Sequence, residues 1–165
     1  QARFRKEAEE EQEEGRVSWS AEIKLIVIQD KKRVGEAAIA DIQMLQGQWL
    51  QIRFEENGVV NPTDSHSAPG AVTTIEGNSF HVGVAGQETI LRGTFTLDAT
   101  TVPKSITWID STGQDAGKPL LAIYDLSKDS FTFVAADAGM PRPTEFSTKP
   151  GLTLRSFVRR DRPPK

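Results

Sequence analysis

The sequence contains no cysteine, which excludes a disulfide framework, a thiolate metal site and a cysteine nucleophile. It contains two histidines, His66 and His81, and two imidazoles do not make a metal site without further ligands. Asp64 lies two residues before His66, but within a polar loop, where such residues are expected anyway. No run approaches the roughly 18 apolar residues that a membrane span needs. We therefore predict no metal site, no cofactor and no membrane span, and the sequence leaves the cellular compartment open.

Sequence motifs typical of enzymes are also missing. No serine lies in a Gly-x-Ser-x-Gly elbow, so the many serines give little support to a hydrolase. The glycines at positions 83, 86 and 93 do not form a phosphate-binding loop, because no strand, glycine loop and helix follow one another there. We therefore predict a protein that is not an enzyme.

Charge is distributed unevenly along the chain. Residues 1–15 contain six glutamates and three basic residues, which account for the net charge of −3 and leave the rest neutral overall. A nucleic-acid footprint is therefore absent. The basic cluster that begins at Arg159 and continues into residues 161–165 is interpreted as a solvated end. Residues 3–14 are strong helix formers without an apolar stripe and predict a solvated helix or a disordered linker. Because the chain begins with Gln1 and not methionine, we interpret it as a processed or excised piece.

The hydrophobic pattern changes twice along the chain. Residues 22–29 are rich in β-branched side chains and predict a strand. From Val34 to Leu45 apolar residues recur at intervals of three and four, which predicts a short amphipathic helix that ends before Gly47. After Gly47 the period is two and turn signals recur, as in antiparallel β structure. Eight strands are predicted there, near residues 48–55, 71–76, 79–84, 88–98, 104–110, 119–126, 131–136 and 152–159.

These elements predict an all-β fold with an eight-stranded antiparallel barrel. Short consecutive hairpins place each strand beside its neighbour in the sequence, and a closed up-and-down barrel removes the exposed sheet edges. A two-sheet sandwich is the alternative, but its crossing connections need longer loops than most of those here. We expect residues 1–35 to form an N-terminal segment with the helix or linker and the extra strand, residues 36–160 the barrel domain, and residues 161–165 a basic tail.

Several strings resemble known families. Gly47-Gln48-Trp49, directly after a short helix, resembles the Gly-x-Trp signature of lipocalins, in which an arginine from the last strand covers the tryptophan; Arg155 or Arg159 is placed to do so here. Further strings resemble a family of uncharacterised bacterial lipocalin-like domains that is numerous in planctomycetes. The resemblance covers residues 40–160, and its strings are Leu45–Trp49, Gly93–Asp98, Lys118–Tyr124, Arg142–Ser147 and Lys149–Gly151. It implies an up-and-down lipocalin-like barrel, often a module of a longer protein, and no activity.

Aromatic residues on separate predicted strands provide the candidate ligand-binding surface. Phe95, Trp108, Tyr124 and Phe133 can line the barrel interior as an apolar wall with a polar handle, which small-molecule pockets favour. An equally open alternative is that they simply fill the barrel.

The segment from Gly139 to Gly151 contains three prolines and is too polar for an ordinary hairpin, so we predict a rigid loop at one end of the barrel. Arg142 could bind a carboxylate or phosphate at the barrel mouth, with Glu145 beside it. Alternatively, Arg142 pairs with Glu145 and the loop seals that end, with Pro143 and Phe146 as structural residues and Phe146 as a hydrophobic peg.

Two hypotheses of different classes follow. The first is a non-enzymatic lipocalin-like module that binds a small, mostly apolar ligand in a cavity open at the end bordered by residues 137–151. The second is a protein-interaction or accessory domain of a larger bacterial protein, with a filled barrel, which contacts a partner through the strand at 22–29, the charged N-terminal helix or the loop at 137–151.

Overall fold

The computed structural model of the protein describes residues 20–65 and 68–160. The chain divides into two units, residues 1–33 and residues 34–165, whereas the sequence suggested a boundary after residue 35. The helix or linker expected over residues 3–14, the histidine His66 and the basic tail 161–165 lie outside the described residues.

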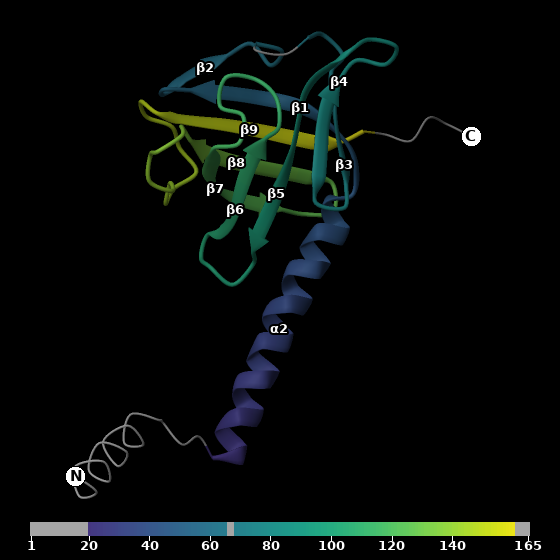
Figure 1. Ribbon diagram of the computed structural model, residues 1–165. Coiled ribbons are helices and arrows are strands. Elements are labelled where there is room, and N and C mark those ends of the chain that lie inside the picture. Colours follow the sequence, from purple (N-terminus) through teal and green to yellow (C-terminus); the bar gives the residue numbers. More distant parts are fainter. Residues whose placement is uncertain (1–19, 66–67, 161–165) are drawn as a thin grey trace, which may run out of the picture. The chain divides into compact units, whose positions relative to one another are not determined.

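The described N-terminal part is a helix. Helix α2 runs from Ala21 to Leu45 (Figure 1). Ser20 begins it: its hydroxyl accepts a hydrogen bond from the Ile23 N–H at 3.3 Å, as a helix N-cap does. The predicted helix over residues 34–45 is the C-terminal part of α2. The predicted strand over residues 22–29 is wrong, because these residues are helical. Their β-branched side chains favour a strand only where a sheet is available to pack against, and no glycine or proline separates them from the helix that follows.

The remaining elements are strands, and their positions agree closely with the sequence-based prediction. The strands and their bounds are β1 (Gly47–Glu56), β2 (Val59–Asn61), β3 (Val72–Glu76), β4 (Ser79–Gly83), β5 (Thr89–Asp98), β6 (Lys104–Asp110), β7 (Pro119–Leu126), β8 (Ser130–Ala136) and β9 (Leu152–Arg159).

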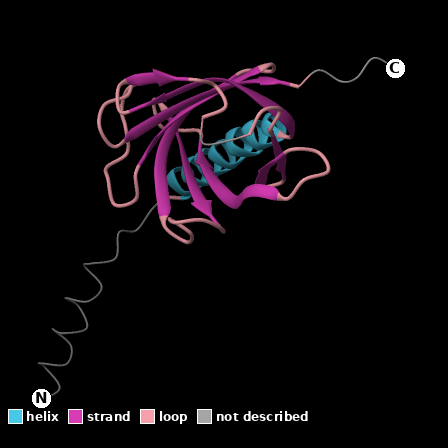
Figure 2. Cartoon of the chain, turned by 90° about the horizontal axis from the view of Figure 1, so that it is seen from above, coloured by secondary structure: helices cyan, strands magenta, loops and turns pink. Residues whose placement is uncertain are grey.

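The sheet closes into a barrel. Each strand from β3 to β8 pairs antiparallel with the next, β1 pairs with β3, and β1 also pairs with β9 (Figure 1). Figure 2 shows these strands following one another around the barrel. The predicted all-β, eight-stranded antiparallel barrel is confirmed, and the closing pair between β1 and β9 excludes the sandwich alternative. The sequence did not predict β2, which pairs only with the end of β1 and lies outside the ring.

Strand β1 contains a bulge that matters for the interior. Gln51 pairs with Phe157 of β9 and Arg53 pairs with Ser156, so Ile52 is an extra residue without a partner. Successive strand residues point to opposite faces, and one extra residue reverses that alternation. The bulge therefore places Gln51 and Phe54, three positions apart, on the same face of β1.

Aromatic and aliphatic side chains fill much of the barrel interior. The main core cluster contains Phe80, Phe95, Trp108 and Phe131. Gly93 on β5 makes room for it, because a Cβ there would lie 2.3 Å from the Ile109 carbonyl oxygen and 2.6 Å from the Phe80 ring. The Phe80 ring then packs edge-on against the Trp108 ring, with 5.2 Å between their centroids.

One end of the barrel is closed by contacts with the end of helix α2. The Trp49 indole is fully buried and donates a 2.8 Å hydrogen bond to the Leu45 carbonyl oxygen. The Arg159 guanidinium lies 4.2 Å from the centroid of the Trp49 ring. It also donates to the carbonyl oxygens of Met44 (2.6 Å) and Gln46 (2.7 Å), two of the carbonyls that a helix C-terminus leaves without internal partners. Of the two arginines that the sequence offered for this contact, Arg159 is the one above Trp49.

Candidate binding cavity

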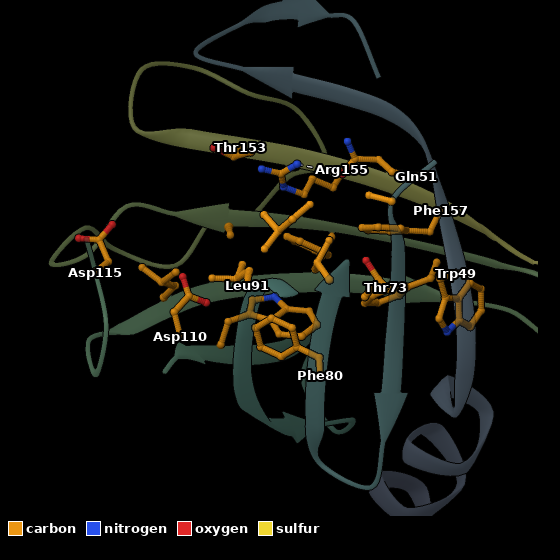
Figure 3. A pocket seen from close by; sticks show the side chains of 18 of the residues that line it. Trp49, Gln51, Thr73, Phe80, Leu91, Asp110, Asp115, Thr153, Arg155 and Phe157 are labelled. Atoms are coloured by element: carbon orange, nitrogen blue, oxygen red, sulfur yellow. Dashed lines mark hydrogen bonds between the residues drawn. The ribbon is translucent and has the colours of Figure 1, made fainter. Parts of the chain in front are cut away.

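The barrel interior is not completely filled. A cavity of about 230 Å³ lies among the strands, smaller than the roughly 300–1,000 Å³ of drug-sized sites and suited to a smaller molecule. Figure 3 shows Trp49 at one end of the cavity and Asp110 and Asp115 at the other. Twenty residues line the cavity: Trp49, Gln51, Ala71, Thr73, Phe80, Val82, Ile90, Leu91, Trp108, Asp110, Asp115, Leu120, Phe131, Phe133, Ala135, Ala136, Asp137, Thr153, Arg155 and Phe157.

Rings in contact with one another form the apolar wall. Trp108 lies 5.0 Å from Phe133 between centroids, and Phe131 and Phe157 stack at 5.8 Å with an interplanar angle of 24°. Of the four aromatic residues predicted for the interior, Trp108 and Phe133 line the cavity. Phe95 is buried in the core behind Trp108, 5.4 Å from it, and is not part of the lining.

Tyr124 is buried but does not line the cavity. Its hydroxyl donates a 2.6 Å hydrogen bond to the Asp41 carboxylate on helix α2. Burial, and then the bond to Asp41, raise the pKa of the Tyr124 phenol far above its ordinary value. The predicted polar handle therefore serves the contact between α2 and β7 and is not presented to a ligand.

Arg155 provides a cationic group in the cavity wall. Its Nη1 donates a 2.9 Å hydrogen bond to Gln51 Oε1, and the guanidinium carbon lies 4.4 Å from the centroid of the Phe54 ring (Figure 3). Because of the bulge at Ile52, both Gln51 and Phe54 face Arg155 across the β1–β9 pair. Burial lowers the pKa of Arg155, while the nearby carboxylates of Glu56 and Asp110 act in the opposite direction.

Three aspartates, Asp110, Asp115 and Asp137, complete the polar part of the lining. Burial, and next the like charge of Asp115, raise the pKa of Asp110, which the charge of Arg155 partly offsets. Asp115 forms an ion pair with Lys118 at 3.8 Å.

The Trp108 Nε1 atom is the one buried side-chain nitrogen or oxygen without a hydrogen-bond partner among the described residues. Trp108 is 6% exposed. A buried N–H without an acceptor is costly, and such atoms in a native protein call for an explanation. Here the residue that carries it is part of the cavity wall.

The loop 137–151 does not present the site that the sequence suggested. Arg142 donates hydrogen bonds to the carbonyl oxygens of Ile106 (2.8 Å) and Ala122 (2.6 Å) and to Thr107 Oγ1 (2.9 Å). Thr107 alternates with two core residues of β6, so its side chain faces away from the barrel interior. Arg142 therefore fastens the loop to the outer face of β6 and β7, and both predictions for it, a ligand fork at the mouth and an ion pair with Glu145, are wrong.

The other loop residues named from the sequence differ in their exposure to solvent. Pro143 is buried and Glu145 is exposed. Phe146 is 41% exposed, so its predicted role as a hydrophobic peg is wrong. A second apolar cluster, which contains Ile123, Val134 and Leu154, lies on the outer face of the last three strands. The loop contributes Asp137 alone to the cavity lining.

His81 lies on β4 and does not line the cavity. No group of three or more His, Cys, Asp or Glu side chains that could hold a metal occurs among residues 20–65 and 68–160. Within the same ranges, no helix has the length and apolar character needed to cross a membrane.

Sequence reasoning missed Gln51, Phe80, Asp110 and Phe157 as cavity residues, and it named Arg155 only for the closed end. Phe80 lies between Ser79 and His81 on a predicted strand, and such alternation is a signal for an inward position; Phe157 lies between Ser156 and Val158 and has a weaker one. Gln51 has no such signal, because it is a polar residue between the apolar Leu50 and Ile52, a pattern that predicts an outward position.

Comparison of the chain with family models, with curated proteins and with solved structures finds no match.

Proposed function

We propose that this chain is a non-enzymatic, lipocalin-like module that holds a small, mostly apolar molecule inside its barrel. The observation that carries the proposal is the cavity of about 230 Å³ among Trp108, Phe131, Phe133 and Phe157. Native cores are packed with few voids larger than a water molecule, so an interior left open on this scale favours a ligand over a structural role alone.

The chemistry of the lining supports binding more than catalysis. Most lining side chains are aromatic or aliphatic, and the polar ones are few, as in small-molecule sites. Among the described residues the lining contains no serine, histidine or lysine, so its three aspartates, which could act as general bases, have no such side chain beside them to activate. On the strength of the sequence strings described above, and of Arg142–Ser147 in particular, we also propose that the chain belongs to the bacterial lipocalin-like family.

Native mass spectrometry of the freshly purified chain, beside a denatured control, tests the proposal. We expect an additional mass of a few hundred daltons that is retained only by the folded chain. Ala135→Leu adds bulk to the cavity lining and should abolish the additional mass, whereas Ala85→Leu makes the same change in an exposed turn and should leave it. If Ala135→Leu retains the mass, the molecule is bound elsewhere and the cavity is not the site.

A second candidate function is that of an interaction module, and one observation favours it. The side chains of Ile23, Leu25, Ile26 and Ile28 on helix α2 are 44–62% exposed in the part of the chain that the structure describes. A helix segment that is apolar all round is normally covered by other protein. Residues 22–29 thus remain the proposed contact surface for a partner, but they present it from helix α2 and not from a strand. The exposed Met140 and Phe146 make the loop 137–151 a further candidate contact.

Native mass spectrometry also tests this candidate through self-association. We expect species at integral multiples of the chain mass. Ile26→Glu should abolish these species, and Lys24→Glu on the same exposed helix should leave them. This result would support the interaction module. A chain that is strictly monomeric at every concentration would count against it.

A further inference from the structure

The cavity wall contains a cation in an unusual position for an apolar interior. Arginines are mostly exposed, and moving a charge away from water is costly unless other groups stabilise it. Arg155 nevertheless lines the cavity from β9, where burial is the main influence on its pKa. Figure 3 shows it between the Trp49 end and the end with Asp110 and Asp115.

The orientation of this guanidinium is fixed in advance. The Phe54 ring supports it at 4.4 Å and Gln51 Oε1 holds Nη1 at 2.9 Å. Both partners come from β1, and the bulge at Ile52 is what allows them to share a face. Bulges near functional sites commonly redirect a side chain in this way. The bond to Gln51 uses one of five N–H donors, and the planar fork matches the two oxygens of a carboxylate.

A second donor occurs in the same lining. Trp108 Nε1 is buried and has no acceptor among the described residues. It lies in a residue of the cavity wall, as does Arg155. Two N–H donor groups in a wall that is mostly apolar are complementary to a ligand that supplies hydrogen-bond acceptors.

The aspartates of the lining favour a cationic ligand, whereas Arg155 and Trp108 favour one with hydrogen-bond acceptors. Asp115 is paired with Lys118. Burial raises the pKa of Asp110, which makes its charged form less favourable than that of an exposed aspartate. Figure 3 places both toward one end of the cavity, on the far side of Arg155 from Trp49. A ligand whose polar head reaches Arg155 and whose apolar body extends toward Trp49 and Phe157 leaves both behind.

We propose that Arg155 is the polar anchor of the cavity and that the ligand is a small apolar acid, whose carboxylate accepts hydrogen bonds from the guanidinium. This inference rests on the proposed binding function. It adds the chemical class of the ligand and the residue that selects it.

Three probes of one chain length test the head group. Isothermal titration calorimetry of the full chain is carried out with octanoate, 1-octanol and octylamine. We expect octanoate to bind about tenfold more tightly than octanol, because a carboxylate forms an ion pair with up to two hydrogen bonds to the guanidinium, whereas the hydroxyl is uncharged and accepts a single bond. Octylamine should bind more weakly than both.

The matched variants are Arg155→Met and Arg53→Met. Arg53 lies on β1, and its half-exposed side chain forms an ion pair with Glu55, so its loss removes the same charge outside the cavity. Arg155→Met should lose the preference for octanoate and retain octanol binding, while Arg53→Met should keep the preference. Arg155→Lys, which retains the charge without the planar fork, should show a reduced preference. It also serves as the test should Arg155→Met fail to fold.

The failures of the two proposals are distinguishable. If none of the probes binds the unaltered chain, the binding function itself is wrong. If octanol binds but octanoate has no advantage, or if Arg155→Met and Arg155→Lys both keep the full advantage, binding stands and the role of Arg155 is overturned. Tightest binding of octylamine would show that Asp110, Asp115 and Asp137 dominate recognition, and would equally overturn the proposal.

Discussion

The hydroxyl of Tyr124 on β7 lies 2.6 Å from the Asp41 carboxylate on helix α2, and the Lys104 ammonium lies 2.9 Å from the same oxygen. Asp41 is 8% exposed. A buried carboxylate is tolerated when donors surround it. These two bonds therefore let a charged residue join the last turns of the helix to two adjacent strands of the barrel.

Replacing Tyr124 with phenylalanine should destabilise the fold. The ring and its packing are kept, but Asp41 loses the shorter of its two bonds, which should cost about 1–3 kcal/mol of unfolding free energy. Urea unfolding followed by circular dichroism measures the change. Lys104→Met is the control, because the half-exposed lysine should contribute less than about 1 kcal/mol. A Tyr124→Phe variant as stable as the parent would show that this bond contributes nothing.

Arg159 should not be replaceable by lysine. The guanidinium binds the Met44, Gln46 and Lys128 carbonyl oxygens at 2.6–2.9 Å while it covers the Trp49 ring. An ammonium cannot make this planar set of contacts, so Arg159→Lys should lower the unfolding free energy by about 2 kcal/mol. The neighbouring Arg160 forms one 3.3 Å side-chain bond, to Gln48, at the surface, and Arg160→Lys should change little. Equal urea midpoints for the two variants would contradict the closing role of Arg159.

The barrel could be predicted from the sequence because each strand is indicated by residues within it and in the turns beside it. The alternation along β5 and β6, and turns such as Asn57-Gly58, where both φ angles are positive, determine where strands begin and end. Pairing each strand with its neighbour then leaves few arrangements, of which the closed ring has no exposed edge.

The N-terminal segment and the site depend on information that periodicity does not contain. Residues 22–29 fit a strand or a helix, and the helix that follows decided between them. Arg155 lies two residues before Phe157 on β9, so both side chains face inward. Its partners Gln51 and Phe54 share that face only because Ile52 of β1 has no partner on β9. Arg142 was assigned to the mouth from its position in the chain, although its contacts are with the sides of β6 and β7.

Removing the Arg142 anchor should release the loop 137–151 from the barrel wall. Arg142→Gln loses three hydrogen bonds from a charged donor and should cost about 2–3 kcal/mol. Limited proteolysis with chymotrypsin should then cut faster at Phe146, which is already partly exposed. Glu145→Gln changes an exposed neighbour and should leave both measurements unchanged. Unaltered cleavage in Arg142→Gln would mean that the prolines alone hold the loop.

Replacing Asp110 with asparagine should stabilise the fold at neutral pH and not at acid pH. Burial, the main cause, raises the pKa of Asp110 in the folded state above the ordinary aspartate value of 3.8. A raised acid pKa means that the folded state holds the proton more tightly than the unfolded chain. The contribution of the neutral side chain is thus fully present below pH 3.8 and is lost as the pH rises through the folded-state value. Asparagine never ionises, so it avoids this loss.

The difference between Asp110→Asn and the parent, measured by thermal unfolding, should therefore be smallest at about pH 3 and should grow to a plateau by about pH 7. Asp125→Asn removes the same charge from an exposed position on β7 and controls for the change in net charge. The opposite sign at pH 7, a less stable Asp110→Asn, would mean that attraction between Asp110 and Arg155 outweighs the cost of burial. In that case Asp110 would compete with a ligand carboxylate for Arg155, and the preference for octanoate over octylamine should narrow.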